Sequence, residues 1–234
     1  MNIIDADVRS MDPTRTDYLA SCQAMGRVAL INLNRFATER QPRDADGRFP
    51  FVAFDLPRLE AWLASQVGWD PSKPSLVCGD IEDEPLTMAL EGSKEAQAFW
   101  REALQMVDEF VGWKTRVLAY GPRLPAWDSP KMWHMESMWR EAKLRLSGSV
   151  DGWAPPLYPV GSGEQEAERA RKIINLACEG GFHVYPYVDL DTERRVVRWA
   201  IRGRKNVKGI LDWCAESRQQ ALGTGSAGLT TSGH

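Results

Sequence analysis

The sequence predicts an α/β fold of the (β/α)8 barrel type, and two observations support this prediction. From residue 75 onward, short runs rich in Val, Ile, Leu and aromatic residues alternate with amphipathic segments of helical periodicity. Such strict alternation is typical of a parallel sheet. Three further apolar runs near the N-terminus bring the expected strands to eight, the number that closes a barrel. An open doubly wound parallel sheet is the alternative.

The expected strands share an apolar, β-branched composition and end at a turn residue, a proline or a polar side chain. They span residues 3–8, 28–35, 50–54, 75–82, 115–120, 150–160, 182–190 and 207–213. The N-terminal strands are irregular in length and spacing. The run at 150–160 contains three prolines, so only its first half can take part in a sheet.

The expected helices carry an apolar stripe at helical spacing. They span residues 12–26, 56–67, 94–113, 129–146, 164–178 and 193–202. In the helix at 94–113, for example, Phe99, Ala103 and Val107 fall on one face. Pro13 and Pro130 each follow a residue suited to an N-cap, which is where proline is tolerated in a helix.

Length and composition indicate one domain over residues 1–214, followed by a flexible tail at 215–234 that is rich in Gly, Ser and Thr. The 29 basic and 32 acidic residues nearly cancel, which argues against a nucleic-acid partner. No signal peptide or run of about 18 apolar residues is visible. We therefore expect a soluble protein without a membrane partner, either cytoplasmic or released by a non-classical route, and the sequence does not predict its oligomeric state.

The four cysteines are widely separated, and none forms the closely spaced pair of a zinc site or suggests a disulfide framework. His134 and His183 also lack the spacing of metal ligands. We therefore expect no transition-metal site and no bound cofactor. Neither a G-x-G-x-x-G nor a G-x-S-x-G motif is present, which weighs against a nucleotide-binding site and an esterase.

The strongest functional signal is Asp80-Ile81-Glu82, where an apolar run ends in acidic residues. If this segment stays extended, Asp80 and Glu82 point the same way, with Cα atoms roughly 6.5 Å apart. Two carboxylates on one face can divide the roles of acid and base, so both are candidate catalytic residues. The alternative is a solvated acidic loop near a helix N-terminus, where Asp and Glu are favoured.

Aromatic and acidic residues also mark the ends of the strands that follow. A barrel forms its site at these C-terminal ends. The candidate substrate-binding residues are Tyr120, Trp153, Tyr158, Tyr185, Tyr187, Asp189, Asp212 and Trp213. The aromatic members could form flat platforms for sugar rings. Asp55, Asp189 and Asp212 could each supply a second acid or serve only as a turn or cap residue, whereas Trp62, Trp100, Trp139 and Trp199 lie on helical stripes and are expected in the core.

The segment from Phe54 to Pro85, which contains LEAWLASQVGWDPSKPSLVCGDIEDEP, resembles the part of barrel glycoside hydrolases where a helix leads into a strand ending Asp-x-Glu. Family 25 lysozyme-type muramidases and hyaluronidase-like barrels share this feature, and RVLAYG, DGWAPPLYP, FHVYPYVDL and VKGILDW are similar to their later strands. The resemblance implies a glycosidase that cleaves a polysaccharide or amino-sugar glycan. It makes Glu82 the general acid, with Asp80 positioning an N-acetyl group or stabilising developing positive charge.

Two other functions remain open at this stage. The acidic cluster could hold Mg²⁺ or Ca²⁺ through oxygen ligands, as in a lyase or phosphoryl-transfer barrel. Alternatively, the barrel could bind carbohydrate without catalysis, because fold does not determine function.

Overall fold

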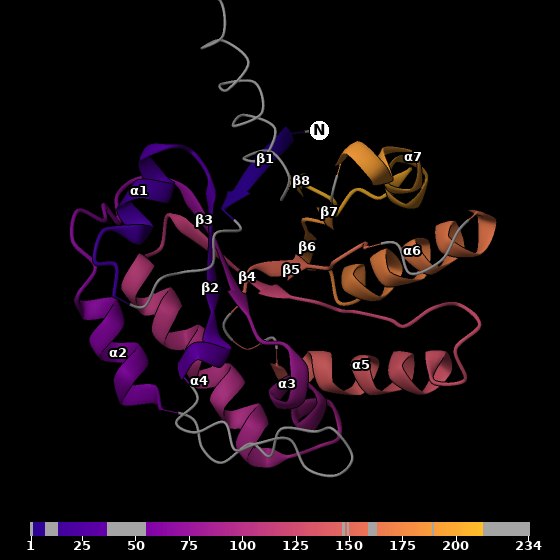
Figure 1. Ribbon diagram of the computed structural model, residues 1–234, viewed down its shortest axis with the longest axis horizontal. Coiled ribbons are helices and arrows are strands. Elements are labelled where there is room, and N and C mark those ends of the chain that lie inside the picture. Colours follow the sequence, from indigo (N-terminus) through magenta and orange to yellow (C-terminus); the bar gives the residue numbers. More distant parts are fainter. Residues whose placement is uncertain are drawn as a thin grey trace, which may run out of the picture.

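The computed structural model describes residues 2–7, 14–36, 55–146, 148, 150–158, 163–188 and 190–212, and its strands form one parallel sheet (Figure 1). The strands are β1 (Asn2–Asp7), β2 (Val28–Asn32), β3 (Ser75–Asp80), β4 (Thr115–Tyr120), β5 (Gly152–Ala154), β6 (His183–Val184), β7 (Tyr187–Val188) and β8 (Gly209–Asp212). The predicted α/β barrel class with parallel strands is confirmed.

The sheet closes on itself through the stretch that contains β6 and β7. The strand order is β6-β5-β4-β3-β2-β1-β8-β7, so β6 and β7 lie at opposite ends of that order although they are neighbours in the chain. On one side of this stretch, the Tyr185 N–H donates to the Trp153 carbonyl at 2.9 Å. On the other side, the Lys208 N–H donates to the Val184 carbonyl at 3.0 Å. Residues 183–188 therefore hydrogen-bond to β5 on one side and to the segment that leads into β8 on the other, which closes the ring. The alternative of an open doubly wound sheet is wrong.

The strands of this ring differ from the expected ones in several respects, and β3 and β5 are shorter than the runs expected over 75–82 and 150–160. The expected strand at 182–190 is divided into β6 and β7, which share one position in the ring. The expected strand at 50–54 lies outside the described residues, and β2 pairs directly with β3 through Ala29 and Val77. Within the described chain, the ring therefore has seven positions.

The helices lie around the outside of the strands (Figure 1). They are α1 (Tyr18–Ala24), α2 (Leu56–Ala64), α3 (Asp83–Leu90), α4 (Lys94–Val111), α5 (Met132–Leu146), α6 (Gly163–Cys178) and α7 (Leu190–Ile201). Two expectations need correction at the N-terminal end. The helix expected over 12–26 begins at Tyr18, with residues 12 and 13 outside the described part, and the strand expected over 28–35 turns into a 3-10 helix, η1 (Leu33–Phe36), after Asn32.

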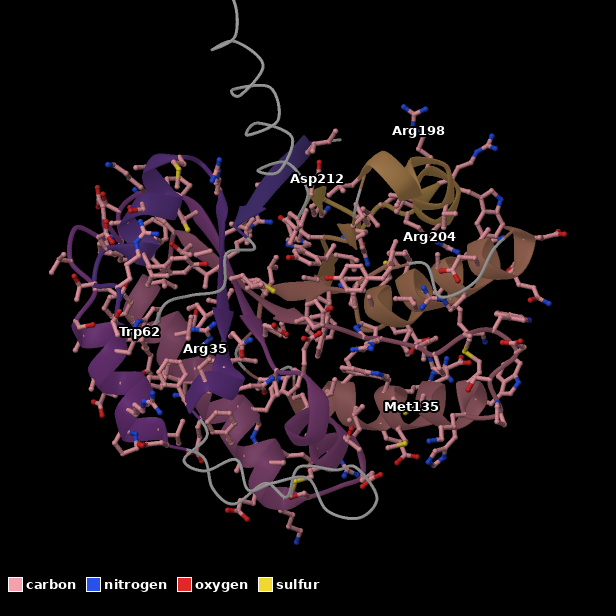
Figure 2. The ribbon with its side chains drawn as sticks, viewed as in Figure 1. Arg35, Trp62, Met135, Arg198, Arg204 and Asp212 are labelled. Carbon is pink, nitrogen blue, oxygen red and sulfur yellow. The ribbon has the colours of Figure 1, made fainter. Side chains whose placement is uncertain are left out.

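Two apolar layers hold the barrel together. The larger one lies between strands and helices and includes Trp100, Trp139 and Trp153, which pack edge to face with ring centroids 6.5 and 6.0 Å apart. Trp62 is also buried in this layer, as predicted (Figure 2). Trp199 is not, because 38% of it is exposed. The smaller layer fills the interior and contains Val28, Cys78, Leu118, Tyr120, Ala154, Tyr185, Tyr187 and Leu211.

Among the helices that the structure describes, none combines the length and apolar character needed to cross a membrane. Cys22, Cys78 and Cys178 are free thiols, whereas Cys214, Trp213 and the tail predicted at 215–234 lie outside the described residues.

Candidate functional site

Strand β3 carries Asp80 into the barrel interior. Side chains alternate along a strand, and Cys78, two residues earlier, belongs to the interior layer. Asp80 is only 5% exposed. The strand ends there, because Glu82 is the N-cap residue of α3 and the helix begins at Asp83. The alternative of a solvated acidic loop is therefore wrong for Asp80, although the helix N-terminus that it included is present.

Three tyrosines gather at the same end of the barrel as Asp80. Tyr120 comes from the end of β4, Tyr187 from β7, and Tyr158 from the segment after β5. The rings of Tyr120 and Tyr187 meet edge to face at 5.9 Å, and those of Tyr158 and Tyr187 at 6.1 Å. A hydrogen bond also joins Tyr120 to Tyr158. We call Asp80, Tyr120, Tyr158 and Tyr187 the tyrosine–carboxylate cluster.

Burial controls the protonation of this cluster. It is the largest cause that raises the pKa of Tyr120 well above its ordinary value, and the charges of Tyr158, Glu82 and Asp80 act in the same direction. The pKa of Tyr187 is raised for the same main reason, with Asp80 among the smaller contributors. Both hydroxyls therefore stay protonated at neutral pH. They are neutral hydrogen-bond donors beside a carboxylate.

An ion pair lies at the rim of the cluster. Arg123, in the segment after β4, approaches Glu82 with Nη1 3.8 Å from Oε1, and their side chains are 56% and 31% exposed. A pair this exposed contributes little to stability. The negative charge of Glu82 is close enough to the cluster to contribute to the raised pKa of Tyr120. The ion pair therefore places one positive and one negative group at the edge of the cluster.

Arg169 on α6 anchors the two segments that carry Arg123 and Tyr158. Its side chain is 2% exposed, and its Nε lies 3.0 Å from both carboxylate oxygens of Glu166. Its Nη1 donates to the Leu124 carbonyl at 2.8 Å, and its Nη2 donates to the Tyr158 carbonyl. Arg169 therefore holds the backbone of the two segments that form the rim of the cluster.

The other predicted site residues lie elsewhere. Trp153 faces the outer layer, where it is fully buried against Trp139 and Phe182. Tyr185 points into the barrel, but its hydroxyl accepts a hydrogen bond from Arg116 toward the other end. Asp212 is 2% exposed and follows Leu211, which faces the interior, so Asp212 faces the outer layer (Figure 2). Asp189 and Trp213 lie outside the described residues.

Four of the predicted aromatic positions do not fit the expectation of sugar platforms. A platform must present the face of its ring to solvent or ligand, yet Tyr120, Trp153, Tyr185 and Tyr187 are all at most 5% exposed. Asp55, a candidate for the second acid, instead caps α2, where its carboxylate accepts from the Arg58 N–H at 3.0 Å.

Three residues near the cluster were missed at the sequence level. Asn32 is the register partner of Asp80 on β2, and it ends an apolar run just as Asp80 does, so the same signal could have identified it. Arg169 interrupts the apolar stripe of α6 with a charge, which is a weaker signal of a buried anchor. Arg123 lies in a connecting segment without any distinguishing pattern.

The described residues offer little for metal or covalent lysine chemistry. They contain no group of three or more His, Cys, Asp or Glu side chains placed to hold a metal ion, so the magnesium-dependent alternative has no donor set in this part of the chain. None of the eight strands contains a lysine. The buried Lys143 lies on α5, where its Nζ donates to the carbonyls of Leu176 and Glu179 at the end of α6.

Comparisons with known proteins give no family assignment. No family model matches the chain, and no curated protein matches it. Several solved chains share part of its shape, and two of them are a dihydrodipicolinate synthase and a member of the same family. One is YagE from E. coli K12, a prophage protein of the dihydrodipicolinic acid synthase family in complex with pyruvate, which is 17% identical, with a TM-score of 0.43. That match covers 79% of this chain, and the chain spans only 53% of YagE.

The other is dihydrodipicolinate synthase from Rhodopseudomonas palustris, with 12% identity, a TM-score of 0.41 and coverage of 96% of this chain and 77% of that one. Neither structure is a glycoside hydrolase. The expected relationship to family 25 or hyaluronidase-like enzymes is therefore wrong, together with the glycosidase activity and the carbohydrate partner that it implied. At these TM-scores, neither likeness transfers an activity to this chain.

Proposed function

We propose that this protein is an enzyme that transfers a proton to or from the carbon beside a carbonyl group of a small substrate. In this proposal Asp80 is the base, and the hydroxyls of Tyr120 and Tyr158 bind the carbonyl oxygen. The observation that carries it is a buried carboxyl group at the same end of the barrel interior as tyrosine hydroxyls that burial keeps protonated. The cluster lies at the C-terminal ends of the strands, where barrel enzymes form their active sites.

The chemistry of the cluster matches this reaction. Removing a proton from the α-carbon leaves negative charge on the carbonyl oxygen, and preorganised neutral donors in a water-poor site stabilise that charge. Because the raised pKa of Tyr120 keeps its hydroxyl protonated, this group can donate a hydrogen bond across the physiological pH range. A carboxylate base that faces a tyrosine donor is an established arrangement for enolisation.

Nucleophilic alternatives have less support in the cluster. Burial, assisted by the charge of Asp80, raises the pKa of the Cys78 thiol well above its ordinary value, so this group is a poor nucleophile. The strands also contain no lysine that could form a Schiff base with a carbonyl substrate. Proton transfer needs only the carboxylate and the hydroxyls of the cluster.

Exchange of α-protons with D2O, followed by ¹H NMR, tests the proposal. The panel is pyruvate, 2-oxoglutarate, dihydroxyacetone and acetoacetate, and the full chain should accelerate exchange for at least one of them. We expect Asp80→Asn to slow that exchange by about 100-fold to 10,000-fold, the usual contribution of a positioned base. We expect Tyr120→Phe to slow it by about 100-fold, because one donor to the developing oxyanion is lost.

Glu102→Gln is the control, because Glu102 is an exposed carboxylate on α4, remote from the cluster in the fold. It should exchange protons at the wild-type rate. Tyr120→Phe keeps the ring in the interior layer and so tests the hydroxyl even if Asp80→Asn fails to fold. The proposal fails if no panel compound exchanges faster than in buffer, or if both cluster variants match the control.

A further inference from the structure

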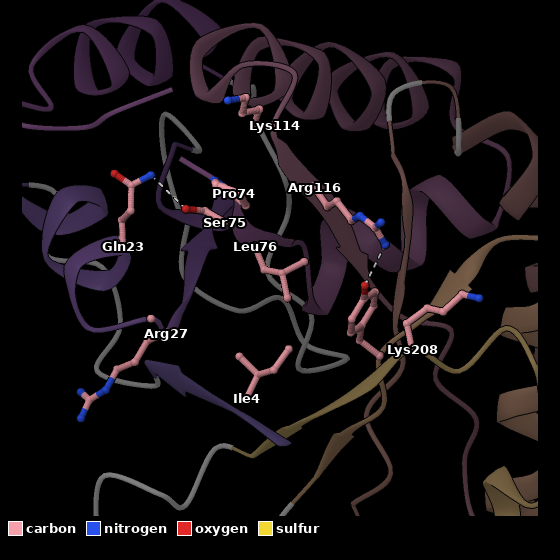
Figure 3. A pocket seen from close by; sticks show the side chains of 11 residues that line it. Ile4, Gln23, Arg27, Pro74, Ser75, Leu76, Lys114, Arg116 and Lys208 are labelled. Carbon is pink, nitrogen blue, oxygen red and sulfur yellow. Dashed lines mark hydrogen bonds between the residues drawn. The ribbon is translucent and has the colours of Figure 1, made fainter. Parts of the chain in front are cut away.

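The end of the barrel opposite the cluster holds a cavity of about 350 Å³ (Figure 3). This volume lies in the range of small-molecule pockets, roughly 300–1,000 Å³. Its lining includes Arg27, Lys114, Arg116, Tyr185 and Lys208. Side chains at this end of a barrel normally serve stability, so a cavity lined by several cationic side chains there needs another explanation.

The charged side chains that line the cavity are all positive. Among the described residues, Arg27, Lys114, Arg116 and Lys208 line it, and no carboxylate does. The guanidinium of Arg27 points away from the others (Figure 3), which leaves Arg116, Lys114 and Lys208. The ammonium of Lys208 is directed away from the cavity centre (Figure 3) and that of Lys114 lies 5.2 Å from the Trp113 ring centroid, so both of these lysines supply charge at the rim. In the part of the chain that the structure describes, none of these three forms an ion pair. Neighbouring cations without a counter-charge raise the local positive potential, which favours a bound anion.

Arg116 is the best-positioned of these cations. It shares the inward face of β4 with Leu118 and Tyr120, so its side chain starts inside the ring. Its Nη1 lies 3.1 Å from the Tyr185 hydroxyl and 3.1 Å from Nδ1 of His183. The Tyr185 oxygen accepts from Arg116 (Figure 3), so its own hydrogen remains available for a ligand. The guanidinium and the hydroxyl together form a preorganised donor set.

The surroundings of His183 show the same positive potential. Burial is the largest cause that lowers its pKa, and the charges of Arg116 and Lys208 lower it further. Asp151 opposes them, but its carboxylate does not line the cavity and accepts from the Val117 N–H at 2.9 Å. Positive charge therefore outweighs negative charge beside the cavity.

We infer that this cavity binds a small multivalent anion, either an organic phosphate or a polycarboxylate. Its oxygens would accept hydrogen bonds from Arg116 and Tyr185, with Lys114 and Lys208 supplying charge at the rim. A guanidinium suits two oxygens of one phosphate or carboxylate, whereas an ammonium acts as a point charge. This inference is independent of the proposed function, because the two sites lie at opposite ends of the strands.

Isothermal titration calorimetry of the full chain with pyrophosphate and with citrate, at about 50 mM salt to limit screening, tests the inference. We expect saturable binding of one anion per chain. Arg116→Gln and Lys208→Gln should each weaken it about tenfold or more, because each removes a charge-assisted donor. Arg198→Gln on α7 makes the same change of charge at an exposed site away from the cavity (Figure 2) and should leave binding unchanged.

Comparison of the two anions distinguishes a phosphate ligand from a polycarboxylate ligand. Binding of pyrophosphate alone identifies a phosphorylated ligand, and binding of citrate alone identifies a polycarboxylate. Because the Lys208 side chain is exposed and its Nζ bonds only to the Lys205 carbonyl at 3.1 Å, Lys208→Gln should fold even if Arg116→Gln does not. The inference is overturned if neither anion binds with a Kd below about 10 mM, since a higher Kd means very weak affinity. It is also overturned if Arg116→Gln and Lys208→Gln both bind the anion as tightly as Arg198→Gln does.

The titration of His183 by NMR gives a second readout. A bound anion adds negative charge beside the imidazole, so it should raise the pKa of His183 from its lowered value. By linkage, the wild type should therefore gain affinity for the anion relative to His183→Gln as the pH falls from about 7 to 6. The titration of the anion itself is common to both proteins, so the ratio of their affinities isolates His183, and His183→Gln should retain binding at about pH 7. An unchanged His183 titration in the presence of a saturating anion would count against the site.

Discussion

Arg169 illustrates how one buried residue organises the candidate site. It is 2% exposed, and its partner Glu166 is 4% exposed, so both charges are removed from water. Removing both charges from water costs free energy, which the attraction within the pair offsets only in part. The guanidinium also makes hydrogen bonds outside the pair, and these fix the neighbouring backbone. Those bonds reach the carbonyls of Leu124 and Tyr158, in the segments that follow the neighbouring strands β4 and β5.

We expect Arg169→Met to lower the free energy of unfolding by about 3–5 kcal/mol, because Glu166 would be left buried without its counter-charge. Glu166→Gln combined with Arg169→Met should recover part of this loss, since no unpaired charge remains. Urea unfolding of the wild type, both single variants and the double variant measures the coupling. A double variant that is no more stable than Arg169→Met alone would contradict the prediction.

At the scale of elements, β5 packs closely between its two neighbouring strands at Gly152. Gly152 pairs with Leu118 of β4 on one side and with His183 of β6 on the other. A Cβ atom at this position would lie 2.3 Å from the His183 carbonyl oxygen. That oxygen belongs to the backbone, so the contact can be relieved only by moving the two strands apart.

Gly152→Ala should therefore destabilise the fold by about 3 kcal/mol, at the upper end of what overpacking usually costs. The matched control is Gly148→Ala, because a Cβ at Gly148 meets nothing within 4 Å. The control should stay within about 0.5 kcal/mol of the wild type. Urea unfolding distinguishes the two, and equal stability of both variants would show that β5 and β6 are not held at this spacing.

At the scale of the whole molecule, β1 links the two ends of the folded chain. It pairs with β2 on one side and with β8 on the other, through Ile3 with Ile210 and Ile4 with Leu211. Closure of the ring therefore depends on the first strand, even though β1 is far from β8 in the sequence. The tail expected at 215–234 lies outside the described residues, and its separation from the domain at 1–214 remains a prediction from composition.

Two truncations test this view. Deletion of residues 2–7 should open the ring and abolish the cooperative urea transition, because β2 and β8 would each lose a neighbouring strand. Deletion of residues 215–234 should change the free energy of unfolding by no more than about 0.5 kcal/mol. Far-UV circular dichroism across a urea titration measures both. A cooperative transition that survives the first deletion would show that β1 is dispensable.

The sequence by itself determined most of the succession of strands and helices, although α3 was not among the expected helices. Strand β4 spans the residues that the pattern predicts, and α4 and α6 match their expected stripes within two residues. This succeeds because periodicity is a local property, readable from neighbouring residues without knowledge of what they contact. Asp80 and Tyr120 were identified in the same way, as polar groups at the ends of apolar runs.

Only the tertiary structure decided which of these side chains meet. Trp153 and Ala154 are consecutive, yet one faces the helices and the other faces the barrel interior. Both faces of a parallel barrel strand are apolar, so the alternation that identifies the buried face of a half-exposed strand is absent. Pairing register sets that choice, and a shift of one residue reverses it. The contacts between distant strands therefore brought Asp80, Tyr120, Tyr158 and Tyr187 together and turned Trp153 away.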